Sequence, residues 1–335
     1  MNTAFYPEDT EKKILVILKI LNAAQGPMGS RLIARQLLDY GVVLSERTVR
    51  YHLKLMDERG LTRLVGRQDG RIITDMGAEE IVSARVHDKV GLTISRIESL
   101  AFKTSFNPET REGLVPVSIS FFPKNRFKKA VKAMEVAFRA GITVSELVGV
   151  AQEGEMIGDV KVPKGKIGFA TVCSIAINGV LLKNGIPMDS KFGGILQIKN
   201  KNPLRFVELI YYSGSSLDPS EAFIRAKMTS VKMACEYGEG KVLANFRDIP
   251  AACRGLVDEI VGKLKNVNIG GVLSIGEVSE PVGQVAVDVN KVGLIFMGGM
   301  NPVACAEEAG YEAENNAMST MMEYGELIPY RAVVE

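Results

Sequence analysis

The chain of 335 residues has little of the side chains from which metal and nucleophilic sites are usually built. Its two histidines and four cysteines are His52, His87, Cys173, Cys235, Cys253 and Cys305. The cysteines form no CxxC pair. A zinc site needs closely spaced ligands of these types, so the sequence gives one little support. We expect reduced, buried thiols, no metal and no cofactor.

Motifs of the common enzyme classes are also absent. The sequence contains no GxSxG, no glycine-rich phosphate loop ending in Gly-Lys-Ser/Thr and no HExxH. A nucleophilic Cys173 would need a base, and no histidine follows His87. We therefore expect no enzymatic activity, although lysine or carboxylate chemistry in an enzyme with an N-terminal winged helix stays open as an alternative.

Long apolar segments are missing as well. The N-terminal MNTAFYPEDTEKK lacks the apolar core of a signal peptide, and no run approaches the ~20 apolar residues of a membrane span. With 46% hydrophobic and 24% charged residues and a net charge of +2, the chain has the composition of a globular protein with two or three domains. We expect it in the cytoplasm.

The N-terminal 77 residues have the pattern of a winged helix-turn-helix. Helices are predicted over 12–22 and from Gly29-Ser30, and a third starts at Ser45, which can cap it, and stops at Gly60. Two β-rich runs follow, 61–65 and 71–74, joined by a loop whose Asp-Gly pair favours a hairpin. The hairpin would be the wing.

This module is a candidate DNA-binding domain. Residues 47–71 contain seven Arg or Lys against three acids, a local charge of +4. Cations on the helix and wing would contact phosphates, while the polar tip of the helix reads base edges in the major groove. The candidate residues are Ser45, Arg47, Thr48, Arg50, Tyr51, Lys54, Arg67 and Arg71. The alternative is a protein-binding adaptor with a solvated basic face, and His52 has the position of a packing residue.

The pattern of predicted secondary structure changes after residue 77. Residues 78–110 are predicted to be a connecting helix and linker, and 111–335 an α/β domain for effector binding and oligomerisation, because β-rich runs there alternate with helices. The sequence of residues 155–185 aligns with that of residues 280–310 without a gap, and Lys-Ile-Gly-Phe at 166–169 matches Lys-Val-Gly-Leu at 291–294. The domain is thus predicted to contain two related α/β halves around a central piece, although glycines make up much of the match.

Each half ends a strand in small residues just before a helix, an arrangement that favours a small anion. The candidate effector-binding residues are Thr171, Cys173, Ser174, Asn178, Gly298, Gly299 and Asn301. The alternative is that the glycines only form a tight turn and Cys173 is a small core residue.

Four long blocks resemble the NrpR family of nitrogen-regulatory repressors: TVRYHLKLMDERGLT, ATVCSIAINGVLLKNGIPMDSKFGGILQI, SGSSLDPSEAFIRAKMTSV and GEGKVLANFRDIP. The resemblance implies a homo-oligomeric repressor that binds palindromic operators and is released by 2-oxoglutarate bound to the α/β domain. It also implies that Cys173 occupies a position associated with effector response. Some family members carry two regulatory domains and this chain carries one. The short form is expected to act as a homodimer or higher homo-oligomer, or with a second NrpR-type subunit.

Overall fold

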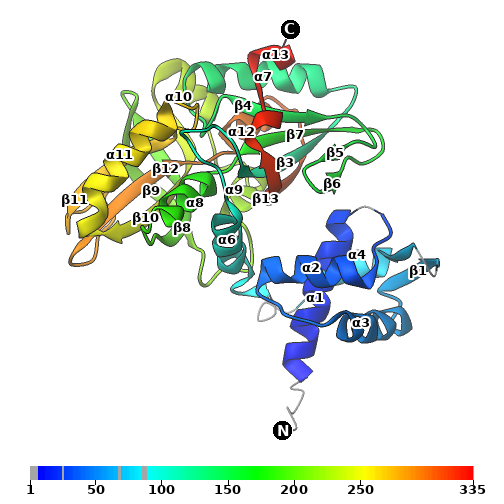
Figure 1. Ribbon diagram of the computed structural model, residues 1–335. Helices are drawn as coiled ribbons and strands as arrows, with labels where there is room; N and C mark the ends of the chain where they lie inside the picture. Colours follow the sequence, from blue (N-terminus) through cyan, green and yellow to red (C-terminus); the bar gives the residue numbers. More distant parts are fainter. Residues whose placement is uncertain (1–6, 25, 67–68, 85–88, 335) are drawn as a thin grey trace. The chain divides into compact units, whose positions relative to one another are not determined.

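A computed structural model describes residues 7–24, 26–66, 69–84 and 89–334. The chain divides into two compact units, which we describe separately (Figure 1). Unit 1 contains Met1–Ser99 with Gly214–Ser216, and unit 2 contains Leu100–Ser213 with Leu217–Glu335. Among the described residues, no helix is both long and apolar enough to cross a bilayer.

Unit 1 contains the predicted winged helix-turn-helix. Its helices are α1 (Pro7–Ala24), α2 (Ser30–Leu37), the short η1 (Leu38–Tyr40), α3 (Glu46–Glu58) and α4 (Asp75–Ser83). Strands β1 (Thr62–Gly66) and β2 (Gly70–Ile73) form the antiparallel wing. Apolar side chains at helical spacing, among them Leu18, Ile33, Leu53 and Met56, make one buried core.

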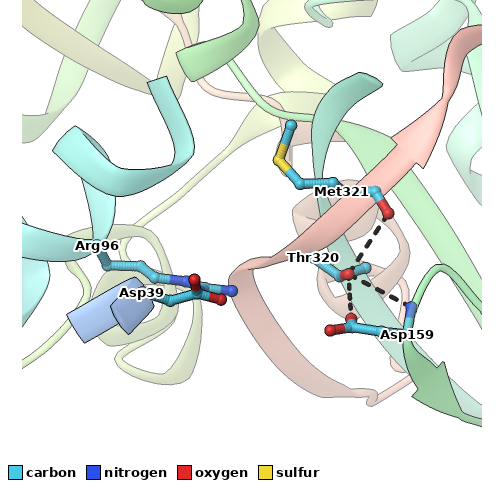
Figure 2. A network of polar contacts seen from close by, with 5 residues as sticks. All are labelled: Asp39, Arg96, Asp159, Thr320 and Met321. Atoms are coloured by element: carbon cyan, nitrogen blue, oxygen red, sulfur yellow. Dashed lines mark hydrogen bonds and ion pairs between the residues drawn. The ribbon is translucent and has the colours of Figure 1, made fainter. Parts of the chain in front are cut away.

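The segment after α4 differs from the linker predicted within residues 78–110. It contains helix α6 (Leu92–Lys103), whose Leu92, Ile97 and Leu100 are buried at helical spacing. Part of the connecting helix predicted at the start of residues 78–110 lies outside the described residues. In unit 1, Arg96 of α6 forms an ion pair of 3.3 Å with Asp39 of η1 (Figure 2). This pair is 14% and 11% exposed, which fixes the start of α6 to the helical module.

Unit 2 contains two five-stranded sheets, and every strand pairing in them is antiparallel. The first has the order β13-β3-β7-β4-β14 and the second β11-β12-β10-β8-β9. The strands of the first sheet are β3 (Leu114–Pro123), β4 (Leu147–Ala151), β7 (Lys166–Val172), β13 (Glu314–Glu323) and β14 (Ile328–Pro329). Those of the second are β8 (Asp189–Lys199), β9 (Asn202–Tyr211), β10 (Gly240–Pro250), β11 (Val272–Val278) and β12 (Lys291–Met297).

The helices of unit 2 separate these strands. They are α7 (Phe127–Arg139), α8 (Ile175–Lys183), α9 (Pro219–Arg225), α10 (Val231–Tyr237), η2 (Ala251–Cys253), α11 (Arg254–Lys265), α12 (Asn301–Glu308), η3 (Tyr324–Glu326) and α13 (Arg331–Val334). A small hairpin of β5 (Met156–Ile157) and β6 (Val160–Lys161) completes the unit. It is tied to β13 by Thr320, which donates a hydrogen bond to the Asp159 carboxylate (Figure 2).

The predicted duplication is present in the order of the elements. The series β3-α7-β4-β7-α8-β8 is repeated as β10-α11-β11-β12-α12-β13, and the central piece contains β9, α9 and α10. The halves exchange a strand, since β8 pairs with β10 and β13 pairs with β3. Helices pair across the halves in the same way, α7 with α12 and α8 with α11. Each half therefore completes the sheet of the other.

This exchange corrects one premise of the effector prediction. Binding beyond the carboxyl ends of strands is a property of open parallel sheets, and the sheets here are antiparallel. The reason is that α8 and α12 lead the chain to the other sheet instead of returning it beside the preceding strand. The location of the candidate site must therefore come from its side chains.

Candidate functional site

The exposed face of α3 presents the side chains predicted to contact DNA. Ser45 caps the helix by accepting a hydrogen bond of 3.1 Å from the Thr48 amide. Arg47, Arg50, Tyr51 and Lys54 are exposed and Thr48 is half-buried. Among the described residues, the ion pairs of Arg50 and Lys54 are long i,i+4 contacts, 3.7 Å to Glu46 and 3.8 Å to Glu58. Such surface pairs are weak, so both cations can turn to phosphate at small cost.

The opposite face of α3 packs into the core of the module. Val49, His52, Leu53 and Met56 are buried in the module's core. His52 contacts the Tyr51 ring edge-on, with ring centroids 5.7 Å apart. His52 is therefore a packing residue, as expected. Tyr51 lies on the outer face and is 62% exposed.

The wing is held by a carboxylate on α3. Asp57 accepts hydrogen bonds from Thr62 Oγ1 and Arg71 Nε, each 2.6 Å long. The Arg71 backbone also pairs with Met28, at 2.9 and 3.0 Å. The structure thus places Arg71, a predicted DNA contact, in a clamp at the base of the wing. Arg67, the other predicted wing contact, lies outside the described residues.

A buried polar network in unit 2 contains two of the predicted effector residues, Ser174 and Asn178. Arg247 of β10 donates to the Ser174 carbonyl oxygen at 3.2 Å, to Ser174 Oγ at 3.1 Å and to Asn178 Oδ1. Asn178 donates to Ser190 Oγ at 3.2 Å. At the other end, Asn245 donates to Ser174 Oγ at 3.2 Å and accepts from the Tyr212 hydroxyl. The network therefore joins β10, α8 and β8.

The thiol of Cys173 lies at the edge of this network. It is 9% exposed, and burial raises its pKa, with partial opposition from a hydrogen bond to the Ile175 amide and from the Arg247 charge. Thr171 is buried in β7, where it pairs with Ser118 and Val148. A protonated, buried thiol is unsuited to nucleophilic chemistry.

Of the predicted residues of the second half, Gly299 lies against Cys173, whereas Gly298 and Asn301 contact Leu243. A Cβ on Gly299 would collide with the Val172 carbonyl oxygen, so the end of β12 abuts the end of β7. Gly298 approaches Leu243 in the same way. Asn301 binds the Leu243 backbone through its amide, accepting at 2.8 Å and donating at 3.0 Å. Asn301 thus has a structural role in joining α12 to β10.

The sequence prediction omitted four members of the network: Ser190, Tyr212, Asn245 and Arg247. They come from strands distant in sequence, and only the strand exchange brings them to α8. One signal was available. The run Asn-Phe-Arg-Asp at 245–248 places an arginine in a strand that also contains the apolar residues Val242, Leu243, Phe246 and Ile249, and arginine is rarely buried without a partner.

Comparison with known proteins identifies both parts of the chain. Residues 90–328 match the family model of the NrpR regulatory domains NRD1 and 2. Residues 15–81 match a winged-helix domain described from ribonuclease R. A crystal structure of a nitrogen repressor-like protein from Methanococcus jannaschii covers 73% of this chain and all of its own, with a TM-score of 0.61 and 28% identity.

Curated relatives agree. The global nitrogen regulator NrpRI of Methanosarcina mazei is 42% identical over 94% of this chain and 96% of its own length. The global nitrogen regulators NrpR of Methanococcus maripaludis and Methanocaldococcus jannaschii are 32% and 31% identical, and the chain spans 53% and 54% of their lengths. These relatives are named as regulators, not enzymes. With a winged helix followed by the NrpR regulatory region, this chain belongs to the NrpR family of nitrogen regulators.

Proposed function

We propose that the protein is a transcriptional repressor of nitrogen-assimilation genes that binds operator DNA through α3 and the wing. The observation that carries the proposal is the exposed cationic face of α3 in a chain whose remainder is an NrpR regulatory region. Arg50 and Lys54 would supply phosphate contacts, and Arg47, Thr48 and Tyr51 stand where a recognition helix meets base edges.

The second part of the proposal is that 2-oxoglutarate bound to unit 2 releases the operator. Family membership supports this effector, and the buried network around Arg247 supports an anion. An allosteric coupling of ~1–3 kcal/mol would change DNA affinity by about 5- to 150-fold, enough for a switch. By linkage, operator DNA weakens effector binding by the same factor.

The proposed assembly is a homodimer or higher homo-oligomer. Two-fold symmetry would match a palindromic operator with half-sites about one helical turn apart. Two of the relatives are nearly twice as long as this chain, so a second NrpR-type subunit is the alternative partner. Mass measurement of the purified protein, alone and with operator, distinguishes these assemblies.

The experiment that tests DNA binding compares matched arginines. Arg50 and Arg139 are both exposed, at 62% and 76%, and each faces a glutamate four residues earlier on its helix. The assay titrates the protein into fluorescent DNA from upstream of nitrogen-assimilation genes at several salt concentrations. Arg50→Ala should bind more weakly, and the slope of log affinity against log salt concentration should be smaller by about 1. Arg139→Ala should match the wild type. Equal affinities for all three proteins would remove α3 from the interface, and salt-insensitive binding to a protein partner without DNA affinity would favour the adaptor alternative.

A further inference from the structure

Arg247 carries a buried positive charge that no described carboxylate neutralises. Its side chain is 1% exposed, and all three of its hydrogen bonds go to neutral acceptors. Burial lowers its pKa, and the groups that oppose this, Tyr212 and Cys173, are neutral at pH 7 because burial raises their own pKa values. A guanidinium nevertheless stays protonated in proteins. The guanidinium lies over the Phe296 ring, 4.8 Å from its centroid, whereas buried charges are ordinarily paired with an opposite charge.

The duplication shows that the strand itself does not require this cation. Arg247 pairs with Leu294 of β12 and Ser190 of β8, and Ser120 pairs with Phe169 of β7 and Asn315 of β13. These partners are 125 residues apart in both cases, so Ser120 is the equivalent of Arg247 in the other half. Ser120 is also buried and is satisfied by one hydrogen bond to Asn315. The same sheet position is therefore built elsewhere with a small neutral side chain.

One edge of the Arg247 guanidinium is left without a partner. Nη1 donates twice and Nη2 donates to Ser174, but Nε has no hydrogen-bond partner. Since Nη2 carries two hydrogens, one of them also remains for the Nε edge. That pair of donors has the spacing with which arginine binds a carboxylate side-on.

A second source of positive potential lies beside the Nη1 and Nη2 end of the guanidinium. Ser174, which accepts from Arg247, is the N-cap of α8, and its side chain makes no cap hydrogen bond. The first turn of α8 has no acidic residue. A helix N-terminus favours an anion, so α8 and Arg247 act in the same direction.

We propose that the Nε edge of Arg247 binds one carboxylate of the effector. The identity of that effector as 2-oxoglutarate rests on the proposed function, whereas the carboxylate anchor rests on Arg247 itself. Because Arg247 is 1% exposed, the carboxylate reaches it only when the chain around the network opens. Binding is thereby coupled to a conformational change, which an allosteric effector requires.

Calorimetric titration of the full-length, DNA-free protein tests this anchor. The probes are 2-oxoglutarate and glutarate, and the variants are Arg247→Met, which keeps the bulk, and Arg247→Lys, which keeps the charge without the fork. Arg205→Lys is the control, because Arg205 is an exposed arginine on β9 whose Nε binds Gln197 at 3.1 Å. We expect Arg247→Met to weaken binding by about 30-fold or more and Arg247→Lys to weaken it less, with Arg205→Lys unchanged.

Thermal unfolding without ligand separates this role from a structural one. Arg247→Met removes a buried charge, which favours folding, but leaves the buried Ser174 and Asn178 oxygens without their donor, which opposes it. We expect a transition temperature near or somewhat below that of the wild type, together with loss of ligand binding. If Arg247→Met unfolds at a much lower temperature, the network needs the guanidinium for folding. Arg247→Lys then decides, because effector affinity equal to that of the wild type in Arg247→Lys overturns the anchor.

The possible results distinguish the anchor from the proposed effector. Binding of 2-oxoglutarate that is equal in wild type and Arg247→Met overturns the anchor and leaves the proposed function intact. Arg247-dependent binding of glutarate without any of 2-oxoglutarate supports the anchor and contradicts the proposed effector. Failure of the wild type to bind either probe contradicts both.

Discussion

The clamp at the base of the wing yields the most direct test of how α3 and the hairpin are held together. Asp57→Ala removes two hydrogen bonds of 2.6 Å, from Thr62 and from Arg71. Thr62 is buried, and the Arg71 and Asp57 side chains are 20% and 26% exposed, so solvent replaces these bonds only in part. A hydrogen bond to a charged group contributes about 1.5–3 kcal/mol. Discounting for exposure, we expect a total loss of about 2–3 kcal/mol.

Glu58→Ala is the matched control on the same helix. It removes only the 3.8 Å pair with Lys54, whose side chains are 76% and 61% exposed, so its cost should stay below about 0.5 kcal/mol. Calorimetry of the full chain should show the transition of unit 1 about 8–24 °C lower in Asp57→Ala, given about 4–8 °C per kcal/mol for a unit of this size. Hydrogen exchange should locate the faster amides in β1 and β2. Equal transitions for the two variants would refute the clamp.

Three further changes have defined outcomes. Gly179→Ala in α8 would place a Cβ against Thr104, so overpacking of about 1–3 kcal/mol should outweigh the helix-propensity gain of about 1 kcal/mol; the control Gly262→Ala in α11, with no atom within 4 Å, should instead stabilise in thermal unfolding. Burial raises the pKa of Asp218 from 3.8 to about 6, so the free energy of unfolding should fall by at most about 3 kcal/mol as pH rises from about 4 to 6. Asp218→Asn can still cap α9, and it should flatten this pH profile in denaturant titrations. Cys173→Leu should blunt the effector response in a DNA-binding titration while sparing DNA affinity, and an unchanged response would place the effector site elsewhere.

Local patterns made the N-terminal module predictable. The apolar spacing of α3, its Ser45 cap and the hairpin at 66–70 all act over a few residues, so the sequence was enough to place them. Helix α6 was not predicted, because its apolar stripe is interrupted by the polar residues Ser95, Arg96 and Glu98. The partner of Arg71 was also out of reach, since Asp57 meets it only through the fold of the wing.

Non-local geometry accounts for what the sequence could not supply in unit 2. The repeat was visible because Lys166–Phe169 and Lys291–Leu294 preserve one strand pattern. The exchange of β8 and β13 left no local trace, and it is this exchange that brings Ser190 and Arg247 together beside α8. Small residues at the strand ends predicted an effector site, but nothing in the sequence linked them to Arg247, which lies on β10, more than 60 residues after Asn178.

The central claim is that an effector in unit 2 controls DNA binding by unit 1. It is tested most directly by measuring operator affinity at fixed salt while titrating 2-oxoglutarate, with glutamate as the control. We predict that 2-oxoglutarate weakens operator binding by about 5- to 150-fold, that glutamate does not, and that operator DNA weakens 2-oxoglutarate binding by the same factor. Specific operator binding that is indifferent to 2-oxoglutarate would contradict the claim.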